Sequence, residues 1–179
     1  MKKQSSLSKL FEYAGKFKYL SILSWVLSVI SAWIALVPFY YIWKIMEEIL
    51  NVAPNYTAAK NLSGYGWKAV GFSILSMFIY ICALMCSHIV AFRVQSNIRL
   101  ELMKHIVTLP MGFIDKEGSG KIRKIVNESS EATEAYLAHQ LPDKAGAIAT
   151  PVGLLVLLLS FDWRLGLLSL IPVVLAFAI

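Results

Sequence analysis

The feature that most constrains this chain is a pair of long segments without a charged residue. Tyr19–Trp43 and Ala69–Phe92 hold 25 and 24 consecutive residues with no Asp, Glu, Lys or Arg. An α-helix rises about 1.5 Å per residue, so about 20 apolar residues cross the roughly 30 Å hydrocarbon core of a bilayer. Composition agrees, because 58% of the residues are hydrophobic and 16% are charged, against about 25% charged in soluble domains. The sequence therefore predicts an all-α integral membrane protein.

Two shorter apolar segments follow. Ala145–Phe161 has 17 residues, near the lower limit for a span, and Leu165–Ile179 has 15. Fifteen helical residues extend roughly 22 Å, which is less than the thickness of the core. We therefore expect a fragment of a longer protein, cut inside a fourth span. The alternative is a natural short protein whose last segment is tilted or re-entrant. The predicted spans are residues 19–43, 69–92 and 145–161, with part of a fourth at 165–179.

The basic residues predict the orientation of these spans. Thirteen of the 17 Lys and Arg residues precede the first span or lie between the second and the third. Such residues are concentrated on the cytoplasmic side of membrane proteins. We therefore expect a multi-pass protein of the plasma membrane with a cytoplasmic N-terminus, and the net charge of +6 reflects topology rather than nucleic-acid binding. Aromatic residues gather at the opposite interface: Tyr40, Tyr41, Trp43, Tyr65, Trp67 and Trp163.

The segment between the second and third spans, residues 93–144, is called the arm below. Apolar residues recur there at helical spacing, at Val94, Ile98, Leu102, Ile106 and Leu109. No Gly or Pro interrupts residues 72–109, so the second span is predicted to continue as one helix to about residue 109, where Pro110 ends it. A short tip at 110–119 and a returning helix at 120–144 complete the prediction. The fold class is a transmembrane helix bundle with long cytoplasmic helical extensions.

No catalytic or metal-binding set is found in the sequence. Gly118-Ser119-Gly120-Lys121 lacks the first Gly of a phosphate-binding loop and the Ser or Thr after its Lys, so it is interpreted as a turn before a helix. Cys82 and Cys86 share a helix face, but no His or carboxylate stands at ligand spacing. We expect no catalytic residue, no metal site and no cofactor bound by this chain.

The residues of the arm resemble a known family. The run Leu109-Pro-Met-Gly-Phe-Ile-Asp-Lys-Glu-Gly-Ser-Gly-Lys-Ile resembles the first intracellular loop of the exporter-type ABC transporter transmembrane domain. The runs from Leu137 to Asp143 and from Phe161 to Leu165 resemble the same family, and the run from Leu7 to Ala14 resembles its amphipathic elbow helix. Asn127 and Glu128 stand seven and eight residues after Gly120, whereas the family pattern has Asn-Asp at eight and nine, which indicates a variant branch.

The resemblance implies the N-terminal part of such a domain, with residues 1–18 as the elbow region. The full-length protein would be an ATP-hydrolysing translocase that works by alternating access. ATP and Mg would bind in a nucleotide-binding domain outside this chain, and the partners would be the bilayer, that domain and a second transporter half in a homo- or heterodimer. The tip would couple to the nucleotide-binding domain through Phe113, Asp115, Lys116, Glu117, Gly118, Ser119, Gly120 and Lys121.

Several alternatives stay open. The substrate path is predicted to include Trp25, Trp33, Tyr40, Tyr41 and His88. The four aromatic residues could instead serve helix packing and interface anchoring, and His88 could lie at the inner interface rather than face a cavity. Pro38, Pro151 and Pro172 could hinge or merely kink their helices. Instead of an exporter, the chain could belong to an importer of a metal–chelator complex, or be a non-transporting four-segment scaffold or regulatory subunit.

Overall fold

The computed structural model describes residues 6–54, 59 and 61–178, with side chains described from residue 10 to residue 172 within these ranges. The described residues are almost entirely helical and include no strand. Three helical stretches are long and apolar enough to cross a membrane, at Leu10–Val52, Leu62–Val107 and Ser119–Phe161. The prediction of an all-α membrane protein is therefore confirmed. The elements are α1 (Ser6–Ala14), the 3-10 turn η1 (Gly15–Phe17), α2 (Lys18–Ile34), α3 (Val37–Val52), α4 (Leu62–Val107), α5 (Met111–Glu117), α6 (Ser119–Ala135), the π-helical turn η3 (Tyr136–Gln140), α7 (Leu141–Phe161) and α8 (Trp163–Ala178).

The chain divides into two compact units. The first consists of the described residues of Met1–Trp25 together with Cys82–Asp143, and the second of those of Val26–Ile81 and Lys144–Ile179. Helices α2, α4 and α7 contribute residues to both. Helix α4 is unbroken over 46 residues, more than twice the length that a span requires.

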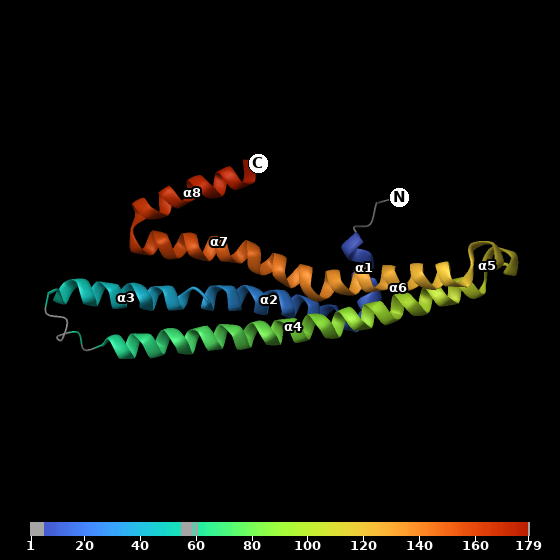
Figure 1. Cartoon of the computed structure of the whole chain (residues 1–179), viewed down its shortest axis with the longest axis horizontal. Coiled ribbons are helices and arrows are strands. Elements are labelled where there is room, and N and C mark those ends of the chain that lie inside the picture. The colour runs from blue at the N-terminus through green and yellow to red at the C-terminus, as the bar shows by residue number, and fades with distance from the viewer. Residues whose placement is uncertain (1–5, 55–58, 60, 179) are drawn as a thin grey trace. The chain divides into compact units, whose positions relative to one another are not determined.

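The first unit is built around the pair α4 and α6, which run side by side with α5 at their common end (Figure 1). Its core combines alanine and valine residues with two leucines: Ala14, Val90, Ala91, Val94, Leu137, Ala138 and Leu141. Small side chains let helix backbones approach closely, which is the main source of packing energy between helices in a membrane. The side chain of Asn97 donates a hydrogen bond of 2.8 Å to the carbonyl of Tyr13, so α1 is held against α4.

The second unit joins parts of α2, α3, α4, α7 and α8 through serine and aromatic contacts. The Ser31 hydroxyl donates a hydrogen bond of 2.9 Å to the carbonyl of Ser76, which links α2 to α4. The Trp43 and Phe161 rings stack with centroids 4.7 Å apart, which links α3 to α7. Asp162 accepts a hydrogen bond of 2.8 Å from the backbone N–H of Arg164, and this cap begins α8.

The prolines have different effects on their helices. The first apolar segment is interrupted at residues 35 and 36, because Pro38 cannot donate a backbone hydrogen bond to Ile34, and α3 then continues past Trp43 to Val52. Pro151 and Pro172 lie inside the continuous helices α7 and α8. The returning helix expected at 120–144 is interrupted by η3, after which Pro142 stands in the first turn of α7.

Candidate functional site

The tip of the arm is a short helix bounded by a proline and a glycine. Helix α4 ends at Val107, three residues before Pro110, and α5 begins directly after that proline. Gly118 separates α5 from α6 with φ +78° and ψ 133°, a backbone conformation that side chains with a Cβ rarely adopt. The Gly118 N–H donates to the Ile114 carbonyl at 2.9 Å, which closes α5. A sharp reversal at this glycine is what lets α6 return along α4.

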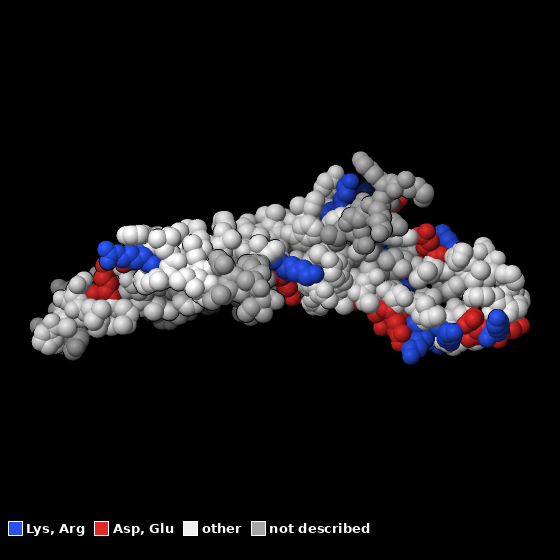
Figure 2. Space-filling view, turned by 90° about the horizontal axis from the view of Figure 1, so that it is seen from above, with Lys and Arg blue, Asp and Glu red and all other residues white. Residues whose placement is uncertain are grey.

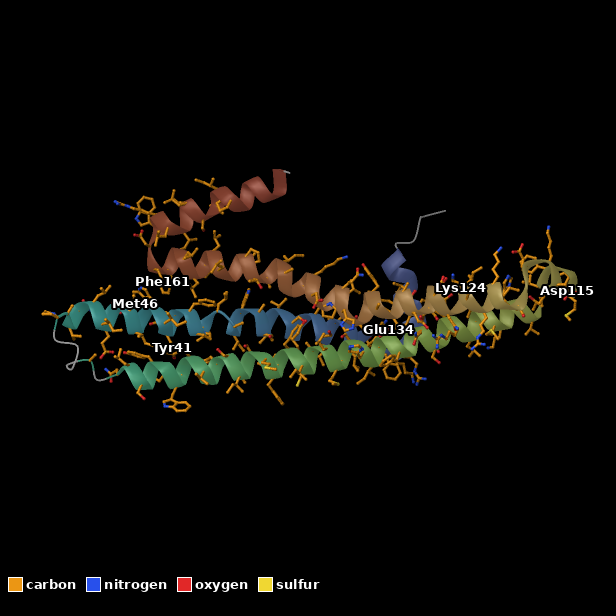
Figure 3. The ribbon with its side chains drawn as sticks, viewed as in Figure 1. Tyr41, Met46, Asp115, Lys124, Glu134 and Phe161 are labelled. Atoms are coloured by element: carbon orange, nitrogen blue, oxygen red, sulfur yellow. The ribbon has the colours of Figure 1, made fainter. Side chains whose placement is uncertain are left out.

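The eight residues predicted for coupling lie on α5, on the Gly118 hinge and in the first turn of α6. Phe113 is 45% exposed, and Asp115 and Lys116 are exposed on α5 without an ion-pair partner among the described residues (Figure 3). Glu117 pairs with Lys121 across the hinge. Basic and acidic side chains alternate over this end of the first unit (Figure 2). The tip thus offers a polar surface around one aromatic side chain, which is suited to contact with a soluble protein domain; its role in coupling stays a prediction.

A hydrogen bond and an ion pair that sequence reasoning missed hold the arm together. Arg99 Nε donates to Ser130 Oγ at 2.8 Å, and its Nη2 lies 3.3 Å from Glu131 Oε1. Ser130 is fully buried, so this contact fastens α6 to α4 about midway along the arm. One signal in the sequence could have indicated this contact. Arg99 precedes Pro110 by nearly as many residues as Ser130 follows Gly118, so a helical hairpin that turns between Pro110 and Gly118 brings Arg99 and Ser130 together.

His88 lies in the first unit beside two other titratable side chains. Its Nδ1 is 3.7 Å from Glu134 Oε1, and its ring meets the ring of His139 edge-on with centroids 4.8 Å apart. Glu134 is at the end of α6 and His139 is in η3, so the cluster joins α4 to the π-helical turn. Such turns are frequent at functional sites. Neither Glu134 nor His139 was singled out from the sequence.

Two of the predicted substrate-path residues line one cavity in the second unit. Trp33 and Tyr40 border a cavity of about 420 Å³ together with residues of α7, among them Gly153 and Ser160. Trp33 Nε1 donates to the Ala149 carbonyl at 3.1 Å, which fixes the orientation of the indole. A Cβ at Gly153 would stand 2.7 Å from Leu36 Cδ1, so the absence of a side chain there lets α7 approach the break after α2.

The other predicted substrate-path residues lie elsewhere. The ring of Trp25 packs against Phe11 in the first unit, with centroids 5.8 Å apart. Tyr41 (Figure 3) stacks on Phe72 of α4 within the second unit, with centroids 5.8 Å apart. The structure therefore brings Trp33 and Tyr40 together, and it gives Trp25 and Tyr41 packing contacts of their own.

A metal site receives no support within the described residues, where no group of three or more His, Cys, Asp and Glu side chains could hold an ion. Cys82 and Cys86 are both free thiols on α4.

Known proteins resemble this chain in sequence. The mycobactin import ATP-binding/permease protein of Mycobacterium tuberculosis is 30% identical over 152 residues, which are 85% of this chain and 17% of that protein. An ATP-dependent lipid A-core flippase of Photobacterium profundum is 31% identical over 120 residues, 66% of this chain and 20% of the flippase. A sophorolipid transporter of Starmerella bombicola is 28% identical over 120 residues, 64% of this chain and 9% of that protein. The matched part is therefore a fifth or less of the length of these relatives.

The family match extends over nearly the whole chain. Residues 21–179 match the family described as the ABC transporter transmembrane region. The match includes the long helix α4, the tip α5 and the return through α6 and α7. The chain therefore belongs to the ABC transporter transmembrane region family.

Proposed function

We propose that this chain is the N-terminal part of a membrane domain that moves a substrate by alternating access, driven by ATP hydrolysis. ATP and Mg bind in a nucleotide-binding domain outside the chain, and a second transporter half completes the translocation path. The domain sits in the plasma membrane with the N-terminus and the arm in the cytoplasm, as the distribution of Lys and Arg favours. The relatives named ATP-binding/permease protein and ATP-dependent flippase support a motor of this kind.

The observation that carries this proposal is the construction of the arm. Two helices run antiparallel, are fastened by the contact of Arg99 with Ser130, and carry α5 at their end. Because helix α4 is continuous from the second span into the arm, movement of α5 is transmitted to the membrane-spanning residues. A rigid element that joins two sites is what coupling between nucleotide state and access requires.

The substrate that we infer is an amphipathic molecule. The cavity beside Trp33 and Tyr40 has predominantly apolar walls with a few polar groups, among them the Ser160 hydroxyl. Cavities of a few hundred Å³ with this lining are typical of sites for small amphipathic ligands. Two relatives are named for lipid A-core and sophorolipid, and a third for import of mycobactin. An importer is the second candidate function, because the mycobactin import protein is similar to this chain over 85% of its length.

The test uses the full-length protein reconstituted in liposomes. Coupling predicts that Phe113→Ala, in the tip, leaves basal ATP hydrolysis intact and abolishes its stimulation by transported lipid. The matched control is Ile125→Ala, which truncates another half-exposed apolar side chain of the arm outside the predicted tip. Equal stimulation in both variants would count against coupling through α5. Complete absence of ATP hydrolysis by the full-length protein would favour the scaffold or regulatory subunit.

A further inference from the structure

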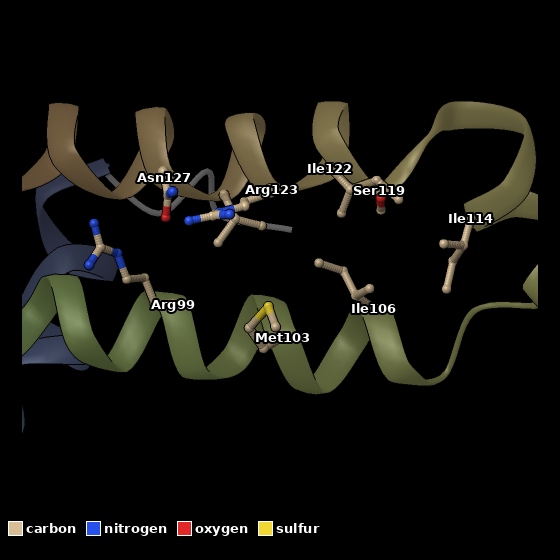
Figure 4. A pocket seen from close by; sticks show the side chains of 9 residues that line it. Arg99, Met103, Ile106, Ile114, Ser119, Ile122, Arg123 and Asn127 are labelled. Atoms are coloured by element: carbon tan, nitrogen blue, oxygen red, sulfur yellow. The ribbon is translucent and has the colours of Figure 1, made fainter.

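A further hollow lies in the arm, within the first unit. It has a volume of about 410 Å³ and lies between α4 and α6 next to α5 (Figure 4). It is called the arm pocket below. Its walls include Arg99, Met103 and Ile106 from α4 and Ile122, Arg123 and Val126 from α6.

Helix geometry explains why these side chains meet. Arg99, Met103 and Ile106 are spaced by four and three residues and therefore share one face of α4. Ile122, Arg123 and Val126 likewise share one face of α6. Arg99 on α4 also binds Ser130, which lies one turn beyond Val126 on α6. This bond holds the two faces opposite each other. The arm pocket is thus a consequence of the register that the Arg99 contact fixes.

The arm pocket has a charged end and an apolar end. Figure 4 shows Ile106, Ile114 and Ile122 toward α5, whereas the guanidinium groups of Arg99 and Arg123 lie toward the opposite end. Asn127 also lines the charged end and Ser119 the end near α5, and the rest of the lining is apolar. An elongated molecule with one polar end and one apolar end fits this distribution.

The charge of Arg123 is not neutralised within the described residues. Arg99 pairs with Glu131, Lys121 pairs with Glu117, and Lys124 pairs with Glu128. Arg123 stands between two of these paired residues on α6 and has no carboxylate partner in the described part of the chain. A guanidinium offers several N–H donors in a planar fork that matches a carboxylate or phosphate. The arm pocket therefore carries one unused anion-binding group beside an apolar wall.

We propose that the arm pocket binds a small amphiphilic anion, with its carboxylate on Arg123 and its hydrocarbon chain along Met103, Ile106 and Ile122. Arg99 stands seven residues, or roughly 10 Å of helix, beyond the end of the predicted second span at Phe92. The ligand is accordingly a water-borne acyl carboxylate from the cytoplasm and not a lipid of the bilayer. This assignment rests on the proposed orientation of the arm. Because the occupant touches both helices that carry α5, its binding alters the stimulation of ATP hydrolysis by transported substrate.

The test is photolabelling of the full-length protein in lipid nanodiscs. The probe is octanoate with a diazirine on its acyl chain, and labelled peptides are identified by mass spectrometry. The expected result is labelling of the α4 and α6 peptides that line the arm pocket. Unlabelled octanoate should compete, whereas octanol and octylammonium, which have the same chain with no charge or the opposite charge, should not.

Two variants and two matched controls test the residues. Arg123→Gln should raise the concentration of octanoate needed for half-maximal competition about five-fold. The expected effect is no larger because the guanidinium is exposed to solvent. Lys124→Gln removes the same charge from the next position, outside the arm pocket, and should leave binding unchanged. Met103→Trp should block labelling by filling the pocket, whereas Ile125→Trp should not; both native side chains are 53% exposed.

The outcomes separate this proposal from the proposed function. Labelling that is equal in Arg123→Gln and in the native protein would overturn recognition of the anion. Absence of labelling in a transporter that hydrolyses ATP normally would show that other parts of the protein cover the arm pocket, and would overturn the proposal while leaving the proposed function intact. Specific labelling without lipid-stimulated ATP hydrolysis would support the arm pocket and count against the proposed function.

Discussion

The hydroxyl of Ser87 on α4 donates a hydrogen bond of 2.7 Å to the carbonyl oxygen of Ala138 in η3. In an α-helix that carbonyl would accept from the residue four positions later, but this residue is Pro142, which has no N–H. Ser87 thus supplies a donor to a carbonyl whose α-helical donor position is a proline, in a region where Ala138 and Pro142 are fully buried. The hydroxyl also lies 2.8 Å from the carbonyl of Leu84, so its proton is shared between two acceptors.

Removal of the Ser87 hydroxyl should destabilise the protein, and the size of the loss should depend on whether residue 142 is a proline. Ser87→Ala is expected to lower the free energy of unfolding by about 1 kcal/mol, the typical net value of such a bond. In a Pro142→Ala background the loss should be smaller, because the new N–H at residue 142 can donate to Ala138. Unfolding of the full-length protein in mixed detergent micelles measures both.

The control for this double-mutant cycle is Ser96→Ala, an exposed serine of the same helix. It should change stability little in either background. A cost of Ser87→Ala that is the same with and without Pro142 would show that the bond to Ala138 does not compensate for the proline.

Gly118, at the hinge, and Gly120, in the first turn of α6, should respond differently to substitution. Gly118 has φ +78°, so Gly118→Val should strain the hinge by about 2 kcal/mol and reduce substrate-stimulated ATP hydrolysis in the full-length protein. Gly120 lies inside α6 with open space around it, so Gly120→Ala should be neutral or stabilise by about 0.5–1 kcal/mol. Thermal unfolding and ATP hydrolysis, measured on both variants, check this. Equal loss of stimulation would contradict the assignment of the hinge to Gly118.

The helices of this chain could be predicted from local signals. The absence of Gly and Pro from residues 72–109 predicted a helix that continues beyond the second span, with its end near Pro110, and α4 ends at Val107. Its start at Leu62, before the predicted span, was not predicted, because this part of α4 contains Gly64, Gly66 and Gly71. A glycine was expected to allow the turn before α6, and Gly118 does so. These features depend on residues within one or two helical turns, which a sequence displays directly.

The contacts between helices could not be predicted in the same way. The pairs Arg99 with Ser130 and His88 with Glu134 are separated by 31 and 46 positions in the sequence, and they depend on the register of the hairpin. The sequence left open whether Pro38 interrupts its helix, because a proline in a membrane helix can be accommodated with or without a break such as the one at residues 35 and 36. The cavity beside Trp33 and Tyr40 depends on Gly153 of α7, which is more than 100 residues away in the sequence. The sequence therefore did not show which aromatic side chains of the first span line a cavity.

The fork geometry of Arg99 should matter more than its charge. Lysine has no planar fork, so Arg99→Lys should lose the bond to Ser130 or the one to Glu131 and destabilise the arm by about 1 kcal/mol. Hydrogen exchange of the α6 backbone in the full-length protein should become faster around Ser130. Arg123→Lys is the matched control, since Arg123 has no such partner in the described residues. Similar exchange in the two variants would show that the bonds of Arg99 to Ser130 and Glu131 do not hold α6 against α4.

The cavity of the second unit should be sensitive to a single methyl group at Gly153. A Cβ there would stand 2.7 Å from Leu36 Cδ1 and 2.9 Å from Trp33 Cδ1, so Gly153→Ala must displace the indole and reshape the cavity. If the substrate occupies this cavity, the concentration of lipid that half-saturates transport should change on the order of ten-fold, as expected for one methyl group in an apolar site. Gly146→Ala, in the same helix but with open space around it, should leave transport unchanged. Thermal unfolding of both variants separates a change in the cavity from a loss of folded protein. Unaltered transport by a folded Gly153→Ala protein would remove Trp33 and its cavity from the substrate path.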